Sequence, residues 1–265
     1  MNWIGKIGQG ILTFFTFNIR LYGLVITTLK QCKHLIDPKK RKIFNYLFMR
    51  QLYNTGVRAA YVNTVIAVLV GWGLMSQAYV LLPPSTGLTE QYAQFFVIVV
   101  IRELGPMISG IILIARSAAA ITSEIGYLRL SNEFENLDAM RMDPVFVLLL
   151  PVFFAFPVSL FFMFFYFDVV CIVASYLVLT LIYDLRLDFT LFISSIVSQI
   201  SMKEVVLSVA KAFLGGSLIG LISILYGASV GGRFTDISRA ISNSTTTQLL
   251  GFFVLNIFLS ILAYR

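Results

Sequence analysis

The sequence has little charge, a single histidine and two cysteines. Only 12% of its 265 residues are charged and 58% are hydrophobic, and the mean hydropathy is +0.87. A soluble domain carries about twice that share of charged residues, so the composition indicates an integral membrane protein. Cys32 and Cys171 lie far apart without a CxxC pair, and His34 stands alone. We therefore expect no disulfide framework, no metal site and no cofactor.

Other sequence motifs are also absent, and each absence argues against a class of protein. The sequence contains no GxxxxGKS or GxxxxGKT motif, so the chain is not expected to hydrolyse ATP through a phosphate-binding loop of its own. Its N-terminal segment has a lone Lys6 and no small-residue cleavage site, which argues against a removed signal peptide. The formal net charge is +7, but the basic residues are clustered. Membrane orientation explains such clusters better than nucleic-acid binding does.

Long apolar runs predict an all-α membrane protein with five spans, because a span needs about 20 apolar residues. The expected spans are 59–80, 93–115, 145–183, 205–225 and 247–264. As one helix, 145–183 would be about 58 Å long, too long for a single untilted span. Pro151, Pro157 and Asp168 permit either one long kinked helix or a tight hairpin. We expect 184–204 to be exposed with a short interfacial helix, and 226–245 to be a loop.

The N-terminal part predicts a separate unit, 1–50, before a membrane domain at 51–265. Residues 10–29 are nearly long enough to span, but Arg20 falls near the middle. We expect a helix in the membrane interface, with a span as the alternative. The basic cluster 39–42 predicts a cytoplasmic flank.

The basic residues also indicate the orientation. With the N-terminus inside, twelve fall on the cytoplasmic side and three, Arg186, Lys203 and Arg265, fall outside. This asymmetry supports a cytoplasmic N-terminus.

Two ionisable residues are predicted to meet inside the membrane. Arg102 and Glu103 interrupt an apolar run, and an unpaired charge at that depth costs about 3 kcal/mol or more. On the expected topology Glu103 lies about 15 Å and Lys211 about 9 Å into their spans, so the two could pair. Asn256 reaches a similar level. Arg102, about 100° round the helix from Glu103, is expected to serve a second partner or water.

After small residues at 117–120, the chain becomes amphipathic. Between Glu124 and Asp143 it carries five carboxylates and two arginines. Apolar residues recur at spacings of four and three through Leu130, Phe134, Leu137 and Met140. This pattern predicts a helix outside the membrane at about 131–142, capped by Ser131 or Asn132 with Glu135 in reach of a capping box. The helix is either a solvated connector or a coupling helix that docks on a soluble partner.

The string RELGP…AR.AAAITSEIG.LR.S.EFENLDAM.MDP, within 102–144, resembles the signature of the MlaE/YrbE family, permeases of lipid-transporting ABC systems. RQLYNTG at 50–56 is similar to the start of that family's first full span. YG at 226–227, GG at 231–232, ISRA at 237–240 and TT at 245–246 resemble its last loop. The resemblance covers nearly the whole chain.

The resemblance implies an N-terminal elbow helix, one long third helix and a homodimer with a lipid cavity at the shared interface. It also implies phospholipid as substrate, a cytoplasmic ABC ATPase and a periplasmic MCE protein as partners, and a Gram-negative inner membrane or, alternatively, a plastid inner envelope. The expected ATPase-coupling residues are Glu124, Arg129, Glu133, Phe134, Glu135, Leu137, Asp138 and Met140. The lipid-pocket candidates are Leu74, Gln77, Tyr79, Val97 and Ile101.

The sequence departs from the family at Asn256, where a carboxylate is common, which leaves the charge of Lys211 less fully balanced. The Glu103 and Lys211 pair is either a structural tie or takes part in lipid binding or gating. The competing functions are an ion- or proton-coupled secondary transporter that uses this pair, and a membrane scaffold that transports nothing. Secondary transporters often show internal repeats, and we find no convincing repeat here.

Overall fold

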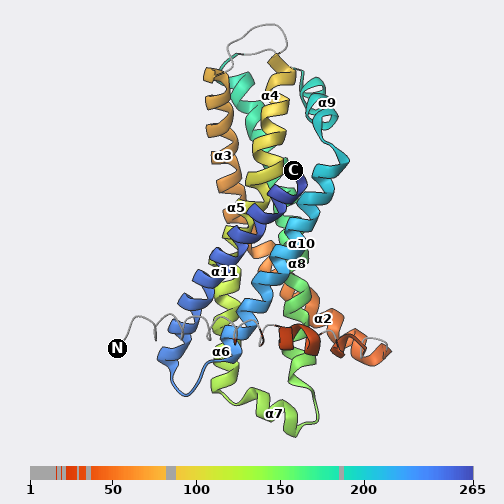
Figure 1. The fold of residues 1–265 in the computed structure, drawn as a ribbon, viewed down its shortest axis with the longest axis vertical. Coiled ribbons are helices and arrows are strands. Elements are labelled where there is room, and N and C mark those ends of the chain that lie inside the picture. The colour runs from red at the N-terminus through yellow and green to blue at the C-terminus, as the bar shows by residue number, and fades with distance from the viewer. Residues whose placement is uncertain are drawn as a thin grey trace.

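The computed structural model describes residues 16, 19, 22–28, 30–33, 37–81, 88–184 and 188–264. Within these residues every regular element is a helix, and five helices are long and apolar enough to cross a membrane. Figure 1 shows an elongated bundle in which the long helices run along the long axis of the molecule.

The described elements follow one another without strands between them. In the first half they are α2 (Pro38–Thr55), η2 (Val57–Ala59), α3 (Ala60–Leu81), α4 (Leu88–Phe96), η3 (Val97–Leu104), α5 (Gly105–Ile112), η4 (Leu113–Ala118), α6 (Ala119–Leu130) and α7 (Glu133–Ala139). In the second half they are η5 (Val145–Leu149), α8 (Leu150–Leu181), α9 (Phe189–Gln199), α10 (Met202–Ala228) and α11 (Phe234–Tyr264). Of these, η3, η4 and η5 are π-helical turns within longer helices.

The apolar helix α8 forms the centre of the bundle, and glycines let its neighbours approach closely. A Cβ atom on Gly216 of α10 would lie 2.5 Å from the Cα atom of Pro157, and one on Gly220 would lie 3.2 Å from the Cβ atom of Phe156. The Gly216-x-x-x-Gly220 pattern therefore marks the face of α10 that packs on α8. On the other side of α8, a Cβ atom on Gly71 of α3 would lie 2.9 Å from the carbonyl oxygen of Cys171.

The segment with two open interpretations, 145–183, is one continuous helix from Val145 to Leu181. Pro157 lies inside it. The hairpin alternative is thereby excluded. Because the helix is longer than the hydrocarbon core is thick, one end extends beyond it.

The prediction of a loop over 226–245 is wrong for most of its length, since α11 already begins at Phe234. The polar run there is helical because its hydroxyl and amide face is buried. Gln248 is fully buried, and its Nε2 donates to Ser223 Oγ at 2.8 Å, Ser244 Oγ at 2.9 Å and the Ile219 carbonyl at 3.3 Å. Ser244 is also within 3.2 Å of Thr122 on α6. Because this part of α11 packs through polar side chains, its sequence lacks the apolar pattern of a buried helix and resembles a loop.

The N-terminal expectations are only partly described by the structure. The predicted interfacial helix over 10–29 falls largely outside the described residues, of which 22–28 are helical. The basic cluster 39–42 lies in the first turns of α2, which begins where the Asp37 side chain accepts from the Lys39 N–H at 3.1 Å. α2 runs through the expected boundary at residue 50 and leaves the bundle sideways (Figure 1).

The second span continues as a helix from Gln91 to Leu130 and leads into α7. The expected capping box is wrong. Asn132 takes a left-handed backbone with φ of 56° and no side-chain cap, while Glu135 pairs with Arg129 Nη1 at 2.8 Å. Asp143 accepts from the Val145 N–H at 2.8 Å, so it opens the next helix.

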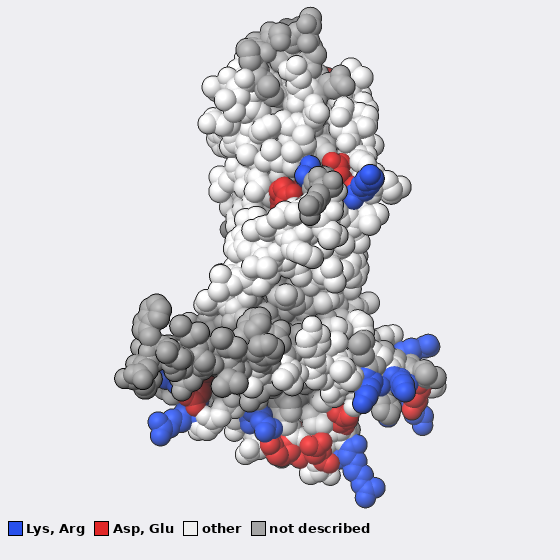
Figure 2. Space-filling view, in the orientation of Figure 1, with Lys and Arg blue, Asp and Glu red and all other residues white. Residues whose placement is uncertain are grey.

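Charge is concentrated at one end of the molecule. Figure 2 shows many Lys, Arg, Asp and Glu side chains at the end that holds α2 and α7, and a small charged group higher on an otherwise uncharged surface. The positive-inside rule predicts that the α2 and α7 end faces the cytoplasm.

Candidate functional site

The site starts from an irregular stretch of backbone in the second span. In η3 the Gly105 N–H donates to the Val100 carbonyl, five residues earlier, as in a π-helix. Pro106, which follows, has no N–H to donate. The carbonyls of Ile101 and Arg102, five and four residues before Pro106, therefore lack the donor that another residue at 106 would supply.

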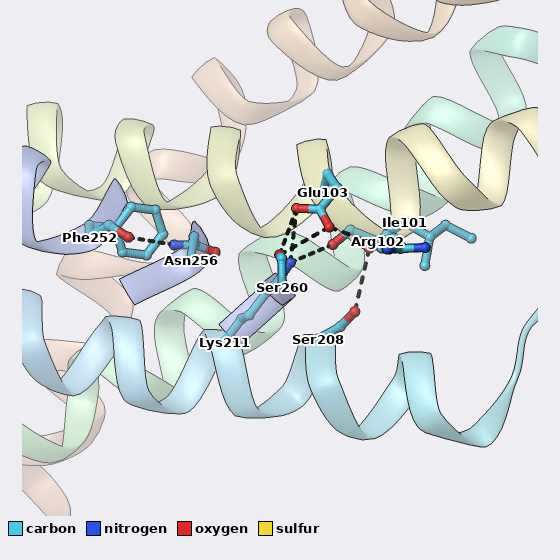
Figure 3. Close-up of polar contacts among 8 residues, drawn as sticks. All are labelled: Ile101, Arg102, Glu103, Ser208, Lys211, Phe252, Asn256 and Ser260. Carbon is cyan, nitrogen blue, oxygen red and sulfur yellow. Dashed lines mark hydrogen bonds and ion pairs between the residues drawn. The ribbon is translucent and has the colours of Figure 1, made fainter. Parts of the chain in front are cut away.

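Two side chains of α10 bind these carbonyls. Lys211 Nζ donates to the Arg102 carbonyl at 2.9 Å, and Ser208 Oγ donates to the Ile101 carbonyl at 3.5 Å (Figure 3). Ser208 and Lys211 are three residues apart and so face the same side of α10. The break in one helix is thus completed by hydrogen bonds from its neighbour.

Glu103 joins three helical segments at this level. Its Oε2 lies 3.1 Å from Lys211 Nζ, and both of its oxygens accept from Ser260 Oγ of α11 at 3.0 Å. Arg102 Nε lies 3.4 Å from Glu103 Oε1. The structure brings Glu103 and Lys211 together, and Figure 3 shows their side chains converging with that of Ser260.

The three charged side chains differ in exposure. The side chain of Lys211 is 0% exposed, that of Arg102 24% and that of Glu103 40%. Two cations and one anion leave a net charge of one positive unit, and the side chain of Glu103 is partly exposed at the surface of the single chain. An incoming anion would find excess positive charge here, together with a carboxylate that can exchange partners.

Asn256 does not join this cluster. Its Nδ2 donates to the Phe252 carbonyl within α11 at 2.8 Å (Figure 3). Ser260, one helical turn further on, makes the contact with Glu103 instead. Ser208 and Ser260 were not predicted from the sequence, although their spacings of three from Lys211 and four from Asn256 place them on the same helix faces.

The expected coupling residues divide into two groups. On α7, Glu133, Glu135 and Asp138 are exposed, while Phe134 packs against the core from below. The Arg129 guanidinium lies 5.5 Å from the centroid of the Phe134 ring. Leu137 is half-buried, and Met140 is 64% exposed. Glu124 lies apart, higher on α6, where it lines two cavities.

The lipid-pocket candidates do not form one pocket within the chain. Val97 is buried in the apolar core. The Tyr79 ring stacks on Tyr183 with centroids 3.9 Å apart. Leu74 and Ile101 are half-buried, and Gln77 is exposed.

One face of α11 is apolar and open. Its exposed side chains recur at spacings of three and four and are 59% to 69% exposed: Leu250, Val254, Ile257, Phe258, Ile261 and Leu262. This face lies on the helix that supplies Ser260 to the charged cluster.

Comparison with known proteins gives a consistent family. The family model described as "Permease MlaE" matches residues 48–262. The intermembrane phospholipid transport system permease protein MlaE of Haemophilus influenzae is 26% identical over 60% of this chain and 59% of its own length. A probable ABC transporter permease of Rickettsia typhi is 25% identical over 85% of this chain and 86% of its own. The chloroplastic protein trigalactosyldiacylglycerol 1 of Arabidopsis thaliana is 23% identical over 80% and 60%, respectively.

Proposed function

Because the chain belongs to the MlaE permease family, we propose that it is the membrane subunit through which an ABC transporter moves phospholipid. The match of the family model to residues 48–262 carries the proposal. The Haemophilus influenzae relative is named as a phospholipid transport permease. The chain itself is a multi-pass membrane protein and performs no catalysis in this scheme. A separate cytoplasmic ATPase hydrolyses ATP.

The Glu103 cluster fits a lipid headgroup. A phosphodiester carries one negative charge, which complements the net positive unit of Arg102, Glu103 and Lys211. The phosphate of the headgroup replaces Glu103 as the anion paired with the ammonium group of Lys211. Competition between two anions for one cation keeps binding reversible, as transport requires.

The ATPase docks on α7 in this scheme. Its exposed carboxylates, Glu133, Glu135 and Asp138, form an acidic surface at the cytoplasmic end, and Phe134 anchors that surface to the core. Movement of α7 is passed up α6 to the Glu103 cluster, because the helix from Gln91 to Leu130 is continuous.

A homodimer completes the lipid cavity. The partly exposed side chain of Glu103 would lie against hydrocarbon if the protein were a single chain, which is unfavourable for a charged group. A second copy that packs on the open face of α11, from Leu250 to Leu262, encloses Glu103 in a shared cavity. The cavity opens toward a periplasmic MCE protein at the end opposite α7.

The membrane in this proposal is a Gram-negative inner membrane. Lipid exchange there serves trafficking to or from the outer membrane and the lipid asymmetry of that membrane. The chloroplastic relative from Arabidopsis thaliana makes the plastid inner envelope the alternative location.

Copurification and charge reversal test the proposal together. The chain is extracted mildly, its partners and bound lipids are identified by mass spectrometry, and ATP hydrolysis by the complex is measured. We expect a P-loop ATPase and a phospholipid to copurify. The double substitution Glu135→Lys and Asp138→Lys should lower lipid-stimulated ATP hydrolysis at least tenfold, because it reverses the charge of the docking surface.

Asp184→Lys is a matched control, since it reverses an exposed carboxylate beyond α8, at the end of the molecule away from α7. It should leave ATP hydrolysis unchanged. If no ATPase is recovered with the folded chain, the ABC assignment fails, and proton-linked transport through Glu103 and Lys211 becomes the function to test.

A further inference from the structure

Two neighbouring cavities lie on the cytoplasmic side of the bundle, away from the Glu103 cluster. The first, of about 280 Å³, is lined by Asn54, Thr55, Arg58, Arg116, Ser117, Ala120, Ile121 and Glu124. The second, of about 210 Å³, is lined by Leu47, Arg50, Gln51, Ile121, Glu124, Ile125, Leu128, Val147, Leu148, Pro151 and Val152. They share Ile121 and Glu124, so α6 forms a common wall between them.

The first cavity is lined by two exposed arginines, Arg58 and Arg116, whose charged groups have no partner among the described residues. Among the described residues, none makes an ion pair or hydrogen bond with the guanidinium groups of Arg58 and Arg116. The same holds for Arg50 in the second cavity. Glu124, which the two cavities share, is the one carboxylate that lines them. Three cations and one anion leave two positive charges, which is an environment for an anion.

A buried donor points to the same place independently. Gln51 is 9% exposed, and its Nε2 atom has no hydrogen-bond partner among the described residues. Leaving a buried donor unsatisfied is costly, so such groups normally have a partner in the working protein. Gln51 lines the second cavity beside Arg50, where a ligand's oxygen atom can accept a hydrogen bond from its Nε2 atom.

The rest of the second cavity is apolar. Leu128, Val147, Leu148 and Val152 are among its lining residues. The pair of cavities therefore offers a basic, hydrogen-bonding end and an apolar end, which matches a ligand that joins an anionic headgroup to a hydrocarbon tail.

The depth of the cavities matches the headgroups of the cytoplasmic leaflet. Arg58 lies two residues before α3, the first span, begins at Ala60. Arg116 follows Glu103 by 13 positions along the same helix, a rise of about 20 Å toward the cytoplasm. That distance separates the cavities from the Glu103 cluster and puts both arginines at the inner edge of the hydrocarbon.

We propose that these two cavities form a second lipid site, which holds the phosphate of an anionic phospholipid from the cytoplasmic leaflet between Arg58 and Arg116. Arg50 and Gln51 bind the remaining headgroup oxygens, and part of one acyl chain enters beside Leu148. The site goes beyond the proposed transport function, since it binds lipid whether or not that lipid is moved.

Native mass spectrometry of the full chain in detergent micelles tests the site directly. Phosphatidylglycerol is titrated against phosphatidylcholine, and bound lipid is counted per chain. The wild-type chain should retain phosphatidylglycerol preferentially. The Arg58→Gln and Arg116→Gln double variant should bind it at least tenfold more weakly, because two charge-assisted hydrogen bonds are lost. Unchanged binding by the folded double variant would overturn the proposal.

Arg41→Gln is the matched control. Arg41 is exposed on α2 and lines neither cavity, so its loss should leave the affinity unchanged. An equal loss of affinity in the Arg41→Gln variant would mean that general surface charge, and not the two cavities, attracts the lipid, and would overturn the proposal. Inorganic phosphate alone distinguishes a lipid from a free anion. It should not displace phosphatidylglycerol at equal concentration, and displacement would mean that the site takes free phosphate.

Gln51→Leu separates binding from folding. A merely structural role for Gln51 predicts a lower thermal midpoint and unchanged lipid binding. The proposed site predicts weaker phosphatidylglycerol binding with an equal or higher midpoint, because the substitution removes an unsatisfied donor. Neither readout involves ATP hydrolysis, so failure of the transport function and failure of this site are distinguishable.

Discussion

The contact between α3 and α8 and the contact of α10 with η3 and α11 join helices in different ways. Between α3 and α8 the bonds are neutral. Most end on backbone carbonyls, and one joins the hydroxyl groups of Thr64 and Tyr166 at 2.9 Å. Asn63 Nδ2 donates to the Met163 carbonyl at 2.8 Å, and Ser175 Oγ donates to the Gly71 carbonyl at 3.3 Å. Around Lys211, ionised side chains bond to one another, and a carboxylate remains partly exposed. The first contact offers a ligand nothing to exchange, whereas the second does.

This difference suggests a division of labour. The bonds between α3 and α8 involve no ionised side chain, so they hold the two helices at close range without a charge that a ligand could compete for. Side-chain ion pairs can change partners with a rotamer change. We therefore expect substitutions between α3 and α8 to affect stability alone, and substitutions in the Glu103 cluster to affect stability and lipid binding separately.

The largest effect is expected from Lys211→Met. This substitution leaves Glu103 without its main cation and the Arg102 carbonyl without its donor. The free energy of unfolding should fall by about 3–5 kcal/mol. It is measured as the loss of folded protein with rising denaturant in mixed micelles.

The double variant Glu103→Gln and Lys211→Met removes both charges. It should recover part of the stability, since Glu103 is no longer left without Lys211, although Arg102 loses its ion pair with Glu103. Transfer of phospholipid should still be lost in this variant. Full transfer by the stable double variant would assign the pair a purely structural role.

The next effect is expected from Gly71→Ala between α3 and α8. The new methyl group would lie 2.9 Å from the carbonyl oxygen of Cys171 and 3.1 Å from the Cβ atom of Ala174. Overpacking of this kind costs about 1–3 kcal/mol. Gly73→Ala is the control, because nothing lies within 4 Å of its Cβ position. Lipid transfer per folded molecule should be unchanged in both, and a selective loss of transfer with Gly71→Ala would contradict the division of labour.

A smaller effect is expected from Gln248→Leu in the contact of α11 with α10. Ser223 keeps its bond to the Ile219 carbonyl, so the loss should be about 1 kcal/mol, measured by thermal unfolding. Lipid binding should be retained, because the residue is polar but uncharged. If lipid binding falls as far as it does in the Glu103 variants, then polar side chains in general, and not only charged ones, are needed for lipid binding.

The smallest effect is expected at Asp188, which caps α9 outside the membrane. Hydrogen bonds from the Thr190 hydroxyl and the Thr190 N–H lower the pKa of this exposed carboxyl group. The folded state therefore holds the proton less tightly than the unfolded state. The stabilisation is present above the unfolded pKa of about 3.9 and is lost as the pH falls through the lower folded value.

Asp188→Asn preserves an N-cap acceptor but removes the titration. Thermal midpoints of the wild type should drop relative to this variant between about pH 5 and about pH 3. A constant difference across that range would show that the carboxylate contributes nothing to the stability of α9.

Much of the fold could be predicted from the sequence, because the dominant signal is apolar length. Five spans follow from runs of about 20 apolar residues, and Glu103 and Lys211 follow from the cost of isolated charges at that depth. The extension of α11 down to Phe234 could not be predicted, since the run through Gln248 is as polar as a loop. Its helical form depends on Ser223 and Thr122, which are distant in sequence.

The details of the site could not be predicted, because they depend on the rotation of each helix about its axis and on the path of each helix through the bundle. Asn256 was expected in the cluster by depth alone, but depth does not give rotation about the helix axis, and Ser260 occupies the place. Glu124 was grouped with the coupling residues by sequence proximity. In the structure it lines cavities with Arg50 and Arg116, because α6 rises away from α7 into the bundle.

The helix from Gln91 to Leu130, which continues through two π-helical turns, also has the geometry of a lever. Its 40 residues span about 60 Å. A tilt of about 5° about its outer end displaces its cytoplasmic end by about 5 Å, close to one helical pitch. Glu103, about 18 Å from that pivot, moves by only about 1.6 Å. With this geometry, a large displacement at α7 would accompany a small displacement at the charged cluster, about half of the 3.1 Å distance between Glu103 and Lys211.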